Sequence, residues 1–207
     1  MVIFGKIVEF LPYILITLKN VASRGIGINR GRAYLEKIYQ KNPVSGDVHE
    51  LFSSGNDMVY PKEIFFTEND FKTMAVDQVK LNFKTPAIIK DKGRFVQTPS
   101  FHTLMKRIRD RFSTLSWFYE GIELDMNYKN FVLNAENVKT IRANVAYIKT
   151  HRKVRNPSGR QNMSGIVGSL SYEGSISEYM PYLLFGQYMH VGKSAVFGNG
   201  WYTVDAL

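Results

Sequence analysis

The amino-acid sequence predicts an α+β protein, because strand-like and helix-like patterns alternate through residues 76–207. Residues 79–83 alternate apolar and polar side chains, which is the pattern of a strand with one buried face. The predicted elements are, in order, strand 79–83, helix 98–116, strands 139–150 and 163–173, helix 177–189 and strand 201–204. This β-α-β-β-α-β order is typical of the ferredoxin-like (RRM-like) fold, in which two helices cover one face of a four-stranded antiparallel sheet.

The helix over residues 98–116 has two distinct sides. Thr98 is the predicted N-cap, and Pro99 is the predicted first helical residue, where a missing backbone N–H costs nothing. Apolar side chains recur at a spacing of three to four, at Phe101, Leu104, Ile108, Phe112 and Leu115. The other side carries Lys106, Arg107, Arg109 and Arg111. We therefore expect a helix that buries one face and presents a basic one.

The first 40 residues echo the end of the chain. Residues 11–15, LPYIL, match residues 180–184, MPYLL, and each segment opens a predicted helix that runs into a glycine loop and a strand with a tyrosine, Tyr34 or Tyr202. Helix 8–22 contains Pro12, so its start is expected a turn later than residue 8. The strand is predicted over residues 33–39, and residues 40–62, with two prolines and two glycines, are predicted to be a loop.

This repeat predicts the domain organisation. Residues 1–40 are predicted to be the C-terminal part of a first ferredoxin-like domain, residues 41–75 a linker, and residues 76–207 a complete ferredoxin-like domain. The first β-α-β-β part of the first domain has no counterpart here. We therefore expect either that Met1 is not the natural start or that the chain is a shortened relative.

Composition indicates a polyanionic partner. The formal net charge of +9 points to nucleic acid or to an anionic membrane, although a basic surface can also be inert. The absence of cysteine excludes disulfides and cysteine-bound metal sites and fits the cytoplasm. The most apolar stretch, residues 7–18, is too short to span a bilayer and lacks a signal-peptide pattern. No membrane association, metal or cofactor is expected.

Two glycine loops are candidate phosphate-binding sites. Glycine lets a backbone approach a ligand closely and adopt positive φ, so that successive N–H groups can point at phosphate oxygens. Neither loop is a P-loop. The alternative is a tight turn that needs small residues for packing. The candidate RNA-binding residues are Arg24, Arg30 and Arg32 around the first loop, and Gly192, Lys193, Gly198 and Gly200 in the second.

A basic hairpin is predicted between the strands that end near residue 150 and begin near residue 163. Residues 139–160 contain no acid, and their cations are Lys139, Arg142, Lys149, Arg152, Lys153, Arg155 and Arg160. A hairpin with this charge is suited to contact phosphates, although a run of like charge can also be a solvated turn.

Histidine is the side chain best suited to metal-free RNA cleavage, because its pKa lies near working pH. The four histidines show no metal-binding motif. His190 follows a predicted helix beside the second glycine loop, and His102 lies in the first turn of helix 98–116, so these two are the candidate catalytic residues. The alternative for each is a packing or capping role. His49 and His151 are placed less favourably.

Residues 163–202 resemble a known family. Residues 186–202, GQYMHVGKSAVFGNGWY, together with residues 98–115 and the loop at residues 24–32, resemble the CRISPR-associated endoribonucleases that process precursor CRISPR RNA, members of the RAMP superfamily. The resemblance implies tandem ferredoxin-like domains and metal-independent cleavage that leaves 2′,3′-cyclic phosphate and 5′-hydroxyl ends. It also implies contact with CRISPR repeat RNA through the glycine loops and a hairpin, onto which Arg152, Lys153 and Arg155 map by position.

The resemblance implies that the family's usual catalytic histidine lies in the first half of the first domain, the segment that has no counterpart in this sequence. We therefore expect this chain to bind repeat RNA and to cut it slowly or not at all. One alternative is a non-catalytic RNA-binding subunit of a CRISPR effector complex, whose other subunits would then be partners. An RRM-like binding module is the third, but the aromatic strand motif that it requires is absent.

Overall fold

The structure is a computed structural model that describes residues 2–27, 29–55, 66–71, 75–123, 127–153 and 159–206. The chain divides into two compact units, an N-terminal unit ending at residue 70 and a C-terminal unit of residues 71–207. The boundary between predicted domains at residue 76 stays a prediction.

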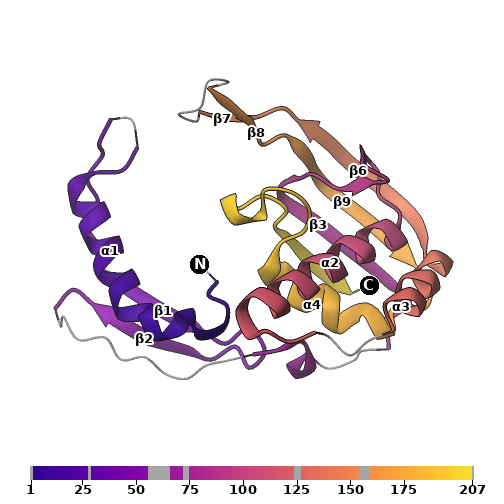
Figure 1. The fold of residues 1–207 in the computed structure, drawn as a ribbon, viewed down its shortest axis with the longest axis horizontal. Coiled ribbons are helices and arrows are strands. Elements are labelled where there is room, and N and C mark those ends of the chain that lie inside the picture. The colour runs from indigo at the N-terminus through magenta and orange to yellow at the C-terminus, as the bar shows by residue number, and fades with distance from the viewer. Residues whose placement is uncertain are drawn as a thin grey trace. The chain divides into compact units, whose positions relative to one another are not determined.

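The C-terminal unit is built on one four-stranded sheet. Its strands are β3 (Gln78–Ala87), β6 (Lys139–Ile148), β9 (Gly165–Glu173) and β10 (Tyr202–Ala206), in the order β10-β3-β9-β6, and all neighbours are antiparallel. Helices α2 (Phe101–Glu120) and α4 (Met180–Met189) cover the same face (Figure 1). The chain order β3-α2-β6-β9-α4-β10 confirms the predicted ferredoxin-like fold.

Helix α2 forms as the apolar spacing predicts, with Phe101, Leu104, Ile108, Phe112 and Leu115 all buried. The predicted N-cap was wrong. Ser100 caps the helix, because its Oγ accepts a hydrogen bond from the Thr103 N–H at 3.2 Å. The Pro99 carbonyl is instead bonded to Tyr172 of β9, so the chain turns into the helix two residues later than expected. Gly121, with φ +68°, ends the helix in the left-handed conformation.

Buried tyrosines attach the helices to the sheet. The Tyr172 hydroxyl donates to the Pro99 carbonyl at 2.9 Å, and the Tyr202 hydroxyl donates to the Leu183 carbonyl at 3.0 Å. Burial raises the pKa of both phenols, so they remain protonated donors. Gly186 of α4 has no room for a Cβ, because the Tyr202 hydroxyl occupies that space.

Two short elements lie where the sequence predicts structure. The strand pair β7 (His151–Lys153) with β8 (Arg160–Asn162) lies in the predicted basic hairpin, and the 3₁₀ helix η4 (Ser177–Tyr179) is the start of the predicted helix 177–189. The elements that are not predicted are the strand pair β4 (Lys90–Asp91) with β5 (Arg94–Phe95), helix α3 (Tyr128–Asn134), and the 3₁₀ helices η3 (Ala135–Asn137) and η5 (Ala195–Phe197). The β7–β8 hairpin extends beyond the end of β6 and β9 (Figure 1).

The N-terminal unit packs one helix on one hairpin. It comprises η1 (Gly5–Phe10), α1 (Leu11–Arg24), β1 (Lys37–Lys41), β2 (Val48–Ser53) and η2 (Glu68–Asp70), and β1 pairs with β2. Leu11 and Leu15 of α1 are buried with Leu51 and Phe52 of β2. The α-helix starts at Leu11, later than residue 8, as Pro12 predicts.

Two predictions for this unit were wrong. Residues 48–53, expected to lie in a loop, form β2. Pro43 and Gly46 belong to the turn of the β1–β2 hairpin, where the Asn42 side chain accepts from the Val44 N–H at 2.8 Å. The strand after α1 begins at Lys37, so Tyr34 lies outside it and is exposed, whereas Tyr202, its counterpart in the repeat, is buried.

No helix within the described parts of the chain is long and apolar enough to cross a bilayer.

Candidate nucleic-acid interface

The loop at residues 190–201, here called the C-terminal glycine loop, joins α4 to β10 and is fastened to the end of β3. The Lys193 N–H donates to the Ile88 carbonyl at 3.1 Å, and the Gly200 N–H donates to the Pro86 carbonyl at 3.0 Å. Within the loop, the Val191 N–H donates to the Gly200 carbonyl at 3.0 Å. The loop is therefore held by backbone hydrogen bonds, while the Lys193 side chain is exposed.

The three candidate glycines of this loop have different surroundings. All three have positive φ, +87° at Gly192, +90° at Gly198 and +75° at Gly200. A Cβ at Gly192 would overlap the Ile88 carbonyl oxygen, and one at Gly200 would overlap the Val191 carbonyl oxygen. A Cβ at Gly198 would meet nothing within 4 Å. Packing alone therefore accounts for two of these glycines, whereas Gly198 faces open space.

The β7–β8 hairpin meets the C-terminal glycine loop. The Arg152 guanidinium lies over the Phe197 ring, 4.6 Å from its centroid, a cation–π contact. At the base of the hairpin, the Met163 carbonyl accepts from the Asn199 side-chain amide at 2.9 Å. Two segments that the sequence singled out separately thus form one surface.

This surface is positively charged. Residues 139–163 and 190–201 contain no Asp or Glu. The exposed cations that the structure describes at the hairpin and the loop are Lys149, Arg152, Lys153, Arg160 and Lys193. Lys139 and Arg142 are also exposed, but they lie on β6, with Lys139 at the end of that strand away from the hairpin. Arg155 lies outside the described residues. Phe197, which contacts Arg152, and Trp201 at the end of the loop are about half exposed, at 47% and 45%.

The cations of helix α2 serve mostly within the unit. Arg107 donates to the Lys90 carbonyl at 2.9 Å and pairs with Asp110 at 2.8 Å, and Arg109 also pairs with Asp110. The Arg111 Nε–H donates to the Met189 carbonyl at 3.2 Å, at the end of α4. The basic side of this helix is therefore engaged in contacts that hold α2, β4 and α4 in place.

His190 lies where α4 ends and the C-terminal glycine loop begins. As the C-cap of α4 it has φ +61°, uncommon for a residue with a Cβ. Its Nδ1 lies 3.1 Å from the Asn199 carbonyl oxygen, which can only accept. Nδ1 therefore carries the proton, and in the neutral ring Nε2 has the free lone pair.

The charge of His190 is set by its surroundings. Burial lowers the pKa of His190, the bond to the Asn199 carbonyl partly offsets this, and the nearby Arg111 guanidinium lowers it further. The imidazole is therefore mostly neutral near pH 7, with Nε2 able to accept a proton.

The two candidate catalytic histidines are not brought together. His102 lies in the first turn of α2, with its Nε2 3.8 Å from a Glu136 carboxylate oxygen. Arg111, which is close to His190, lies nine residues further along α2, on the opposite flank and about 13 Å along the axis. Of the other two histidines, His151 is exposed on β7, and His49 lies on β2 of the N-terminal unit.

The first glycine loop is closed by the Ile26–Gly31 bridge, with the Ile26 N–H donating to the Gly31 carbonyl at 2.7 Å. Arg24, Arg30 and Arg32 are exposed around it. It belongs to the N-terminal unit, and its part in RNA binding stays a prediction.

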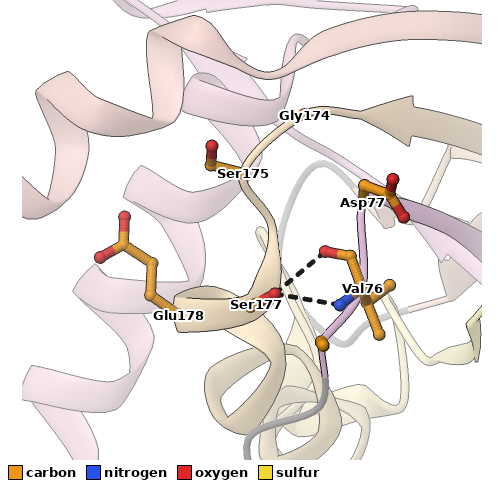
Figure 2. A pocket seen from close by; sticks show the side chains of 7 residues that line it. Val76, Asp77, Gly174, Ser175, Ser177 and Glu178 are labelled. Carbon is orange, nitrogen blue, oxygen red and sulfur yellow. Dashed lines mark hydrogen bonds between the residues drawn. The ribbon is translucent and has the colours of Figure 1, made fainter.

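A separate hollow lies at the other end of the sheet, where β9 leads into α4 (Figure 2). The Ser177 hydroxyl accepts from the Val76 N–H at 3.0 Å and donates to the Val76 carbonyl at 3.2 Å. Asp77 and Glu178 line it, so its charge disfavours phosphate. Among the residues that the structure describes, no group of three or more His, Asp or Glu could hold a metal ion.

Sequence reasoning missed four residues of the interface. Asn199 and Met163 are single residues between regular elements, Phe197 lies in the short helix η5, and Arg111 was grouped with the other cations of helix α2. An asparagine between two glycines was the one available signal, since a buried polar side chain needs hydrogen-bond partners.

Comparisons with known proteins agree with the fold. The model of the CRISPR-associated endoribonuclease Cas6 family matches residues 81–202, and a second model, described as an N-terminal domain, matches residues 1–64. A solved Cas6 product complex is 14% identical with a TM-score of 0.55, covering 95% of this chain and 73% of that one. A Cas6 substrate-mimic complex is 13% identical with a TM-score of 0.53, covering 95% and 75%.

A search of curated proteins finds no significant match to this sequence. The two solved structures, at this low identity, establish similarity of fold. The family model carries more, because it spans more than half of the chain and includes both α2 and the C-terminal glycine loop. The chain therefore belongs to the CRISPR-associated endoribonuclease Cas6 family.

Proposed function

We propose that this protein binds CRISPR repeat RNA on the surface formed by the C-terminal glycine loop and the β7–β8 hairpin, and that His190 moves a proton there in slow, metal-independent cleavage. Family membership assigns the chain to CRISPR RNA processing or binding. The single observation that carries the location is the contact of Arg152 with Phe197, which joins the two segments.

The charge and shape of this surface support RNA binding. Its cations can neutralise phosphates without competition from carboxylates. Phe197 and Trp201 are exposed enough for bases to stack on them, which suits single-stranded RNA. Gly198 leaves the backbone open to a close ligand.

The proposed chemistry uses the lone pair on His190 Nε2. Nε2 takes the proton of a ribose 2′-hydroxyl, and the 2′-oxygen attacks the adjacent phosphorus. The bond from phosphorus to the 5′-oxygen breaks, a 2′,3′-cyclic phosphate forms, and the departing 5′-oxygen takes a proton from solvent. The Lys193 and Arg111 cations favour the negative charge on the phosphate in the transition state.

Cleavage is slow in this proposal because one positioned group does the proton transfer. A general base or acid contributes about 10²–10⁴-fold, and no paired acid is described at this site. CRISPR effector subunits remain predicted partners.

The test is a single-turnover assay with labelled repeat RNA in EDTA. The protein should yield a 2′,3′-cyclic phosphate slowly, and His190→Ala should reduce the rate by about 10²–10⁴-fold while retaining RNA binding. His102→Ala is the matched control and should leave the rate unchanged. Binding without any product, from the unaltered protein, would favour a non-catalytic RNA-binding subunit. A protein that does not bind repeat RNA would contradict the proposal entirely.

A further inference from the structure

Asn199 contacts three separate segments at once. It is 6% exposed, although its side chain is polar. Its side-chain amide donates to the Met163 carbonyl at 2.9 Å, its backbone carbonyl accepts from His190 Nδ1 at 3.1 Å, and its N–H faces the Ser194 carbonyl at 3.3 Å. This residue therefore joins α4's end, the C-terminal glycine loop and the chain that enters β9.

Met163 belongs to the base of the β7–β8 hairpin. Its N–H donates to the Thr150 carbonyl at 3.0 Å, so it closes the hairpin opposite the end of β6. The neighbouring Ser164 is 2% exposed, and its hydroxyl accepts from the Thr150 N–H at 3.1 Å. A hydrogen-bonded path thus runs from the hairpin base through Met163 and Asn199 to the imidazole of His190.

The direction of each hydrogen bond requires an amide at position 199. The Met163 carbonyl can only accept, so the side chain at 199 must donate. The carbonyl of residue 199 must also stay in place, because it selects the Nδ1–H form of His190. If this carbonyl moves, the ring can carry its proton on Nε2, and Nε2 then has no lone pair with which to accept a proton.

We propose that Asn199 is a positioning residue that couples the β7–β8 hairpin to His190 and keeps the His190 imidazole in its Nδ1–H tautomer. The inference deepens the proposed function and rests on it for its biological role. It predicts that the hairpin contacting RNA and the histidine moving a proton form one rigid site rather than two independent ones.

The test removes the amide in two ways. Asn199→Ala deletes the donor, and Asn199→Asp keeps the shape but places an acceptor oxygen against the Met163 carbonyl. Asn82→Ala is the matched control. It also removes a side-chain amide of the C-terminal unit, one that donates a hydrogen bond to the Asp205 carboxylate at 2.8 Å between strands β3 and β10.

The primary measurement needs neither RNA nor activity. The ¹⁵N shifts of the imidazole nitrogens, assigned by comparison with His190→Gln, report which nitrogen carries the proton. The unaltered protein and Asn82→Ala should show Nδ1–H at His190, and both Asn199 variants should show a shift toward Nε2–H. The same variants should lower the single-turnover cleavage rate by about 10- to 100-fold while changing RNA affinity little.

An unchanged His190 tautomer in a folded Asn199→Ala or Asn199→Asp protein would overturn the inference. If one variant does not fold, the other gives the measurement. If neither folds, Ser164→Ala tests the same path from the hairpin side, and an unchanged tautomer there would likewise overturn it. Loss of RNA binding by the unaltered protein would contradict the proposed function instead, since the tautomer measurement does not depend on RNA.

Discussion

Two glycines of the C-terminal glycine loop form a matched pair for testing how this loop is held. Gly200 and Gly198 both have positive φ, +75° and +90°, so alanine at either position pays the same kind of backbone strain, about 1–2 kcal/mol. They differ in their neighbours. A methyl group at Gly200 would overlap the Val191 carbonyl oxygen, whereas one at Gly198 would meet nothing within 4 Å.

The overlap sets the expected difference in the free energy of unfolding. To relieve it, residues 191 and 200 must separate, which breaks the hydrogen bond from the Val191 N–H to the Gly200 carbonyl. Val191 is fully buried, and a buried group without its partner costs about 1–3 kcal/mol. Gly200→Ala should therefore lower the free energy of unfolding by about 2–5 kcal/mol, and Gly198→Ala by about 1–2 kcal/mol.

Urea unfolding followed by tryptophan fluorescence measures this difference. The signal reports on the C-terminal unit, because both tryptophans, Trp117 and Trp201, lie in residues 71–207. Equal destabilisation by the two alanines, within about 0.5 kcal/mol, would refute the reasoning from close packing.

Three further predictions concern other parts of the molecule. Phe52→Ala should destabilise the N-terminal unit by about 3–5 kcal/mol, as a buried aromatic of β2, whereas Val48→Ala, on an exposed β2 residue, should stay within about 0.5 kcal/mol; hydrogen exchange of the β2 amides distinguishes them. Burial holds the pKa of His190 below that of an unfolded histidine, which is about 6.5. As pH falls through this value, the unfolded state binds more protons than the folded state, so the free energy of unfolding should decrease with falling pH. His190→Gln should remove that part of the pH dependence, which a urea series from pH 5 to 8 measures; an unchanged slope would contradict it. Gly198→Val should weaken RNA binding, since its side chain would occupy open space at the surface; unchanged affinity with lowered stability would identify the loop as a packing turn only.

The sheet and its two helices were predictable because their signals are local and repeated. The alternation around Leu81 and the buried stripe from Phe101 to Leu115 extend over enough residues for periodicity to outweigh single exceptions. The first residue of α2 was not predictable, because the hydrogen bond from the Tyr172 hydroxyl to the Pro99 carbonyl is a tertiary contact. Strand β2 was missed because Pro43 and Gly46 indicate a turn without showing that a strand follows it.

The interface was predictable only in parts. The glycines and the acid-free basic segment are visible in the sequence, and so is His190 beside them. Their assembly is not, because Arg152 and Phe197 are far apart along the chain and meet only through the fold. The role of Asn199 depends on three contacts that no local pattern specifies.

The most direct test of the proposed interface is the salt dependence of repeat-RNA affinity. Each phosphate contact to single-stranded RNA adds about 0.7 to the slope of log K against log salt. Arg152→Ala with Lys153→Ala should therefore lower the slope by about 1.4 and weaken binding. The matched double variant, Lys129→Ala with Lys139→Ala, removes the same charge near α3 and the far end of β6, and should leave the slope unchanged. An unchanged slope in the hairpin variant, or an equal fall in both, would contradict an RNA-binding surface at the hairpin and the C-terminal glycine loop.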